Sequence, residues 1–230
     1  TTSDYVFCLN VDENNYLKNQ YGEGVSGPGF NIYSAGTLYK TITKDQHWDP
    51  SIHEELHTIE EYTDKQGRTV LKRTYVKSGT SNQTLDTYYV YDDFGLLRYV
   101  IPPEGAAALG IDLDRSPDDN VIKKWCYYYE YDKKHRLIIK KLPGQDEIRM
   151  IYDTRDRLVM TQDGELRTDY NWNITFYDEL NRPVATGIYH NIDFYFQHAH
   201  EIEDYNLFQV NWSSIVKDYQ SNSHLYNNNN

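Results

Sequence analysis

Short runs of aromatic and β-branched residues, separated by short polar breaks, follow one another along most of the chain. In the clearest example, residues 87–101, one apolar run ends at Tyr91 and a second begins at Leu96. Aromatic and β-branched side chains suit a pleated, half-buried sheet surface. In the polar break between the runs, Asp92 is suited to bond the backbone two residues on, and Gly95 tolerates a positive φ. The pattern therefore predicts a β-hairpin.

The same break recurs at five places, and each copy begins with Asp. The fourth residue is Gly, Gly, His, Asp or Asn, and apart from Gly these are the residue types most enriched in left-handed backbone conformations. A type I turn closed by a bulge needs such a residue there. The first and fourth residues are therefore predicted to have structural roles in the turns. They are Asp64 and Gly67, Asp92 and Gly95, Asp132 and His135, Asp153 and Asp156, and Asp178 and Asn181.

Tyrosine stands directly before the turn Asp in the last four copies, as Tyr91, Tyr131, Tyr152 and Tyr177. Apolar runs flank every turn, so the repeating unit is predicted to be strand, turn, strand. The period is roughly twenty residues, which is typical of stacked repeats. A segment at 102–121, which contains prolines, alanines and glycines, lengthens one interval and is predicted to be an insertion.

The motif Tyr-Asp-x-x-Gly/Asn-Arg-Leu resembles the YD repeat of the RHS/YD-repeat family, which includes bacterial RHS proteins and has relatives in Tc-toxin shells and teneurins. The likeness covers residues 33–188 and extends to linking runs similar to those of large surface RHS proteins of Bacteroidetes-type bacteria. The resemblance implies a mainly all-β fold, in which antiparallel hairpins form a curved open sheet or part of a β-shell. The linking runs are 35–44, 63–73, 88–103 and 140–144.

The same resemblance implies a non-enzymatic structural or interaction module in a large secreted or cell-surface protein that encloses or presents a C-terminal effector. The expected partners are adjacent repeats of the same parent chain, an effector domain or a cell-surface glycan, and the expected location is extracellular or on the bacterial surface. The chain starts without Met and stops at a run of Asn, so we expect an excised piece of a longer protein.

Three regions are expected along the chain. Residues 1–32 are predicted to form a strand and a Gly/Asn-rich loop, and residues 33–188 to form the repeat sheet with its insertion at 102–121. After the insertion, the chain is expected to return to the sheet at Ile122. Residues 189–230 carry apolar side chains at three- and four-residue steps and then a polar tail, which predicts a C-terminal amphipathic helix followed by disorder.

The amino-acid composition limits which kinds of partner are expected. The net charge of −12 and the pI near 5.0 provide no basic field for phosphates, so nucleic acid is not expected as a partner. No apolar run is long enough to span a bilayer as a helix. The 23 Tyr against 7 Phe favour a wide one-layer sheet with a wet edge. Cys8 and Cys126 form no metal or redox motif, and the sequence leaves open whether they pair.

The stretch His53-Glu54-Glu55-Leu56-His57 fits H-E-x-x-H, in which two His on one helical face hold zinc and Glu acts as general base. That chemistry requires a helix. From Leu56 the pattern instead alternates and runs into the first turn, which predicts an extended strand. We therefore expect strand or loop histidines, with no catalytic residue, metal or cofactor. A zinc hydrolase and an adventitious surface metal site remain the remote alternatives.

Two further sets of residues suggest roles in binding or packing. Tyr88, Tyr127 and Tyr129 are candidates for stacking on sugar rings, which would make a carbohydrate-binding surface the alternative function, provided that these rings face solvent. Arginine follows the last three turns, and we expect it to bond the turn Asp or the carbonyls of an adjacent repeat. These arginines are Arg136, Arg157 and Arg182.

Overall fold

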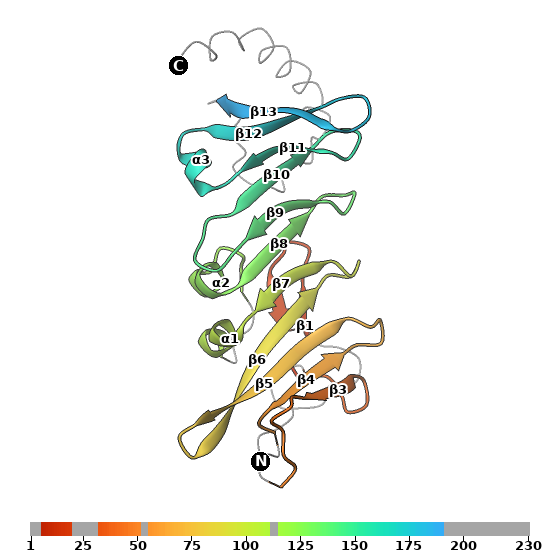
Figure 1. The fold of residues 1–230 in the computed structure, drawn as a ribbon, viewed down its shortest axis with the longest axis vertical. Coiled ribbons are helices and arrows are strands. Elements are labelled where there is room, and N and C mark those ends of the chain that lie inside the picture. Colours follow the sequence, from red (N-terminus) through yellow and green to blue (C-terminus); the bar gives the residue numbers. More distant parts are fainter. Residues whose placement is uncertain (1–5, 20–31, 52–54, 111–114, 191–230) are drawn as a thin grey trace. The chain divides into compact units, whose positions relative to one another are not determined.

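The computed structural model describes residues 6–19, 32–51, 55–110 and 115–190 (Figure 1). Within them, 11 antiparallel strands, β3 to β13, follow one another through one sheet in sequence order, and β1 and β2 form a two-stranded sheet. In the described part of the chain the order has two ends, β3 and β13, so the larger sheet is open. The prediction of a mainly all-β, antiparallel open sheet is confirmed.

The chain divides into two compact units. The first comprises residues 1–129 and 142–145, and the second comprises 130–141 and 146–230. The boundary between the two units lies inside residues 33–188, which were expected to form one repeat sheet. Strand β8 (Tyr127–Tyr131) contributes residues to both units.

The first unit contains the hairpins of the first two turns and two short helices of the insertion. Its elements are β1 (Leu9–Val11), β2 (Leu17–Asn19), β3 (Tyr39–Lys44), β4 (Thr58–Thr63), β5 (Thr69–Ser78), β6 (Ser81–Tyr91), β7 (Leu97–Ile101), α1 (Pro103–Leu109) and α2 (Asn120–Trp125).

The second unit contains the last three turns. Its elements are β9 (Leu137–Lys141), β10 (Ile148–Tyr152), β11 (Leu158–Gln162), α3 (Gly164–Thr168), β12 (Asn171–Tyr177) and β13 (Pro183–His190). Its core is the buried set Ile151, Val159, Met160, Trp172 and Ile174.

The turns have the geometry that their sequences predict. Each of the five fourth residues has a positive φ, between 61° and 81°. In four hairpins, the strand register shifts at the residue pair that precedes the turn Asp, which is the signature of a bulge. The shifts fall at Tyr62/Thr63, Val90/Tyr91, Ile151/Tyr152 and Phe176/Tyr177.

The prediction that the sheet resumes at Ile122 is wrong, because residues 120–125 form α2 and β8 begins at Tyr127. Asp119 caps this helix, since its side chain accepts a hydrogen bond from the Val121 N–H at 2.7 Å. Asp is a strong N-cap, and the apolar residues Ile122 and Trp125 stand three apart, a spacing that a helix also satisfies. Ile122 is fully buried, so its burial stabilises α2.

Two other short helices lie between strands. Helix α1 packs closely on the sheet. A Cβ at Gly105 would lie 3.1 Å from Cys126 Sγ and 3.3 Å from Ile101 Cγ2. In the second unit, Asp163 caps α3 by accepting a hydrogen bond from the Leu166 N–H.

Several predictions concern residues outside the described ranges. These are the Gly-rich loop at 20–31, the His53-Glu54 part of the H-E-x-x-H stretch, and the C-terminal helix and tail of 189–230 beyond His190. Among the residues that the structure describes, no helix has the length and apolar character needed to cross a membrane.

Candidate functional site: a ladder of turns

Each turn Asp organises its own turn. In the third copy, Asp132 Oδ1 accepts from the Lys134 and Arg136 N–H groups at 2.8 and 2.9 Å. Its other oxygen accepts from Arg136 Nε at 2.7 Å. The same three bonds form in the other turns. In the second copy, Leu96 supplies the second backbone N–H and Arg98 supplies the guanidinium. The equivalent carboxylates are Asp64, Asp92, Asp153 and Asp178.

The arginine of one turn also contacts the next turn. The guanidinium of Arg136 lies over the Tyr152 ring, 4.9 Å from its centroid. Its Nη1 donates to the Asp153 carbonyl at 3.2 Å and to Asp156 Oδ1 at 2.7 Å. In return, the Tyr152 hydroxyl donates to the Leu137 carbonyl at 2.9 Å. We call this set of contacts an inter-turn bridge. In it, the arginine of one turn stacks on the tyrosine of the next turn, and the hydroxyl of that tyrosine bonds a carbonyl of the strand that follows the first turn.

A second inter-turn bridge follows in the same unit. Arg157 lies 5.0 Å from the centroid of the Tyr177 ring, and its Nη1 donates to the Asp178 carbonyl at 3.2 Å and to Asn181 Oδ1 at 3.3 Å. The Tyr177 hydroxyl donates to the Leu158 carbonyl at 2.9 Å. The prediction that these arginines bond the turn Asp or the carbonyls of an adjacent repeat is confirmed: all three bond the turn Asp, and Arg136 and Arg157 also bond a carbonyl of the next turn.

The first unit contains the same arrangement between its first two turns. Arg68 lies 5.1 Å from the centroid of the Tyr91 ring, and the Tyr91 hydroxyl donates to the Thr69 carbonyl at 3.2 Å. The left-handed residue of the next turn is Gly95, and a Cβ there would lie 3.5 Å from Arg68 Nη1. The bridge therefore depends on the Tyr before the Asp, whereas the fourth residue of the next turn varies.

The last described turn has an arginine but no bridge. Arg182 bonds Asp178 at 2.6 Å, yet its side chain is 71% exposed, compared with 12% for Arg136 and 19% for Arg157. Large apolar side chains beside it are also exposed, namely Leu180, Val184 and Ile188. Among the described residues, β13 pairs on one side only, with β12. An unpaired edge of this kind presents free N–H and C=O groups.

The opposite end of the strand order differs from the repeat pattern. All six residues of β3 are exposed. The first turn carries Thr63 in the position that Tyr occupies in the other copies, so it lacks the acceptor ring of a bridge. Its neighbour Tyr62 instead donates to Glu60 Oε2 at 2.8 Å, and Lys40 pairs with Glu60 at 2.7 Å. Within the first unit, the bridge therefore starts from Arg68 and points to the following turn, as the bridges of the second unit also do.

The proposed sugar-stacking tyrosines do not share one exposed surface. Tyr88 is only 6% exposed, and its ring lies 5.9 Å from the Phe7 ring. Burial raises the pKa of Tyr88 well above its usual range. Tyr127 and Tyr129 are half-buried. Tyr88 does line a hollow of about 240 Å³, together with Phe7, Gln83, Asp86 and Ile101.

The histidine of the H-E-x-x-H stretch that the structure describes lies in a loop. His57 stands directly before β4 with φ 66°, which is incompatible with the helix that the zinc motif requires. The structure brings it to Asp45 and His47, two residues that the sequence analysis did not connect with it. These residues stand at the two ends of the loop that joins β3 to β4, and they meet because the two strands pair. Cys8 and Cys126 form no disulfide bond with each other.

No family model matches the chain, and no curated protein matches it in sequence. Among solved structures, TcdB2-TccC3 without its hypervariable C-terminal region matches 80% of this chain at 13% identity, with a TM-score of 0.51. TcdB2-TccC3-Cdc42 matches 80% at 12% identity, also with a TM-score of 0.51. The Photorhabdus luminescens Tc holotoxin pore matches 64% at 14% identity, with a TM-score of 0.48.

This chain covers 9% of the first two matched chains and 6% of the third. The Tc toxin proteins contain RHS repeats, and the matches at a TM-score of 0.51 show that this chain has an RHS-like β-sheet fold. At identities of 13% and 12%, these two matches show similarity of fold only.

Proposed function

We propose that this chain is a non-enzymatic structural and interaction module. It forms part of an RHS-like shell in a large secreted or cell-surface bacterial protein of the Bacteroidetes type, which encloses or presents a C-terminal effector. The observation that carries the proposal is the direction of the inter-turn bridges: Arg68, Arg136 and Arg157 each contact the tyrosine of the next turn, and Arg182 is the equivalent arginine of the last described turn.

The chemistry of a bridge explains why repeats add to one another. A guanidinium on a tyrosine ring contributes about 0.5–1 kcal/mol when exposed and about 2 kcal/mol when desolvated. Each added turn also pairs a strand edge and covers the apolar residues beside it, as Tyr177 does for the edge of β11. Stability in such arrays is approximately a sum of repeat and interface contributions. An end without its neighbour lacks one interface.

In this proposal the partner of Arg182 and β13 is a further strand from the same parent chain, which begins with a Tyr-Asp turn or its equivalent. The effector and any cell-surface glycan would contact the larger surface that many repeats make together. An extracellular location follows from the kind of parent protein proposed. The chain's net charge of −12 disfavours nucleic acid as a partner.

The test is to express the chain together with the flanking segments of its parent and to compare amide hydrogen exchange of residues 183–190 with that in the 230-residue chain. The proposal predicts strong additional protection of β13 in the longer protein. Arg182→Met should then destabilise the longer protein but leave the 230-residue chain nearly unchanged. Unchanged exchange at β13, together with flanking segments that carry no repeat, would contradict the shell.

Carbohydrate binding is the second candidate function. The hollow beside Tyr88 combines aromatic rings with the polar groups of Gln83 and Asp86, which is the mixture typical of small-molecule sites. A glycan array probed with the 230-residue chain tests this function. Binding that is lost in Gln83→Ala but retained in a Gln145→Ala control would support it, and the absence of binding to any glycan would remove it.

A further inference from the structure

The hairpin between β3 and β4 brings three metal-ligating side chains together, away from the ladder of turns. Asp45 follows the last residue of β3, and His57 precedes the first residue of β4. The Asp45 N–H donates to the His57 carbonyl at 2.9 Å, which extends the β3–β4 pairing one step beyond Lys44 and Thr58. The Asp45 and His57 side chains therefore start from paired positions on adjacent strands.

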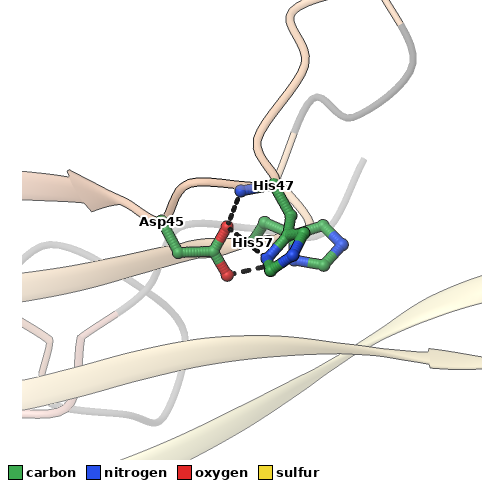
Figure 2. A group of neighbouring side chains, drawn as sticks. All are labelled: Asp45, His47 and His57. Carbon is green, nitrogen blue, oxygen red and sulfur yellow. Dashed lines mark hydrogen bonds and ion pairs between the residues drawn. The ribbon is translucent and has the colours of Figure 1, made fainter.

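His47 completes the group through a tight turn. Its N–H donates to Asp45 Oδ1 at 2.7 Å, so its ring returns toward the carboxylate. His57 Nδ1 lies 3.1 Å from Asp45 Oδ2, and His47 Nδ1 lies 3.9 Å from Asp45 Oδ1. Figure 2 shows both imidazole rings on the same side of the carboxylate, and their centroids are 5.9 Å apart. One potential ligand atom from each residue lies within 4.8 Å of the other two.

We propose that Asp45, His47 and His57 form a surface binding site for a divalent transition-metal ion of the Zn²⁺ class. Zinc bonds imidazole nitrogen and carboxylate oxygen at about 2.0–2.2 Å, so neighbouring ligand atoms of a tetrahedral site stand about 3.4 Å apart. The distance between His57 and Asp45 already fits. All three side chains are exposed, so a small rotation of His47 brings the third ligand into place.

The ligand set also determines which ions fit. Two imidazoles and one carboxylate suit zinc and its neighbours, whereas Mg²⁺ and Ca²⁺ prefer oxygen ligands. Asp45 is exposed, and an exposed aspartate carboxyl is charged at neutral pH, so it offers an anionic oxygen ligand. Three protein ligands leave the fourth position to water, as at an open zinc site.

A bound ion would join the two strands of the hairpin at the end of the sheet. β3 pairs with β4 on one side only among the described residues, and all its residues are exposed. An ion bound to Asp45 and His57 would hold the beginning of β4 to the end of β3. Because such an ion binds only the folded hairpin, it would shift the opening equilibrium toward the closed form.

The experiment uses the 230-residue chain, stripped of metal with a chelator and titrated with ZnCl₂ in a non-coordinating buffer. Calorimetry gives the stoichiometry and affinity, and histidine ring resonances in a ¹³C–¹H spectrum identify the ligands. We expect one Zn²⁺ per chain at this site, with shifts of the His47 and His57 signals that persist in a large excess of Mg²⁺. Amide exchange of residues 39–45 should slow on addition of zinc.

His47→Ala and His57→Asn should each lower the affinity by about tenfold or more, since weaker outer-shell changes already cost 10–100-fold. Asn is chosen at position 57 because it tolerates the positive φ there without supplying an imidazole. His190→Ala is the matched control, because His190 is an exposed histidine that bonds Asn171. The proposal is overturned if the wild type binds no zinc, or if both histidine variants bind zinc as tightly as wild type does.

Discussion

The turns at 153–157 and 178–182 have the same internal bonds but different surroundings. In both, the Asp bonds two backbone N–H groups and the arginine Nε. Arg157 also contacts Tyr177 and the Asp178 carbonyl, whereas the Arg182 side chain is 71% exposed. The bonds inside each turn therefore come from its own residues, but the contribution of its arginine to stability depends on the presence of a following repeat.

The same comparison separates two kinds of stabilisation. An exposed ion pair contributes about 0–1 kcal/mol, because solvent screens it and the side chains lose entropy. A mostly buried guanidinium that stacks on a ring and bonds carbonyls contributes more, and removal of one partner leaves polar groups without bonds. The same substitution made at equivalent positions in the two turns therefore measures how much a neighbouring repeat adds to the free energy of unfolding.

The largest difference is expected for the turn carboxylates. Asp153→Ala removes three hydrogen bonds at a side chain that is 4% exposed and leaves Arg157 without its carboxylate. We expect a loss of about 3–4 kcal/mol in the free energy of unfolding. Asp178→Ala, in the last described turn, should cost much less, because solvent screens its interactions. Urea unfolding of both variants measures the difference, and equal losses would contradict the comparison.

The arginines should show the next largest difference. Arg136→Met keeps much of the packing but removes the ion pairs to Asp132 and Asp156 and the bond to the Asp153 carbonyl. The expected loss is about 2 kcal/mol. Arg182→Met should change stability by less than about 0.5 kcal/mol. Thermal unfolding followed by circular dichroism compares the two variants, and an Arg182 effect as large as the Arg136 effect would show that the bridge contributes nothing.

The tyrosine hydroxyls should have a smaller effect. Tyr152→Phe retains the ring under Arg136 but leaves the Leu137 carbonyl without this donor. We expect a loss of about 1 kcal/mol in the free energy of unfolding. Tyr170→Phe, at an exposed tyrosine outside the bridges, serves as the control and should be neutral. Urea unfolding measures both, and a neutral Tyr152→Phe would show that the bridge does not need the hydroxyl.

The smallest effect concerns acid. A hydrogen bond from Lys134 and the nearby Arg136 guanidinium hold the pKa of Asp156 below its usual range. A carboxyl with a lowered folded pKa stabilises the protein above its unfolded pKa of about 3.9, and that contribution is lost as the pH falls through the folded value. Asp156→Asn should therefore flatten the decrease of stability below about pH 4. Asn181→Asp introduces a carboxyl without the lysine partner of Asp156. It should therefore steepen the decrease of stability by less than Asp156→Asn flattens it. Acid titrations followed by fluorescence compare the variants.

The repeating turns were accessible from the sequence because their chemistry is local. Asp at the first position and Gly, His, Asp or Asn at the fourth define the turn through bonds within five residues. The first contact of each arginine, with its own turn Asp, follows from the same spacing. Apolar runs on both sides of each turn also predict antiparallel hairpins, whereas the open sheet was expected only from the family resemblance.

What the sequence did not predict depends on contacts between distant residues. The place of Arg136 over Tyr152 requires the register of β9 against β10, which the pattern does not specify. The segment 120–125 is helical because Asp119 caps it and Ile122 is buried. The same apolar residues would also suit a strand, so the pattern alone did not decide between helix and strand. Asp45 and His57 lie 12 residues apart and meet only because β3 and β4 pair.

A double-mutant cycle between Arg136 and Tyr152 tests the inter-turn bridge most directly. Both residues lie in the second unit, so urea unfolding of that unit reports on both. The free energy of unfolding is measured for the wild type, Arg136→Met, Tyr152→Leu and the double variant. Contact between the two turns predicts a coupling energy of about 1 kcal/mol or more. Additive losses, with coupling near zero, would contradict a stabilising bridge between these two turns.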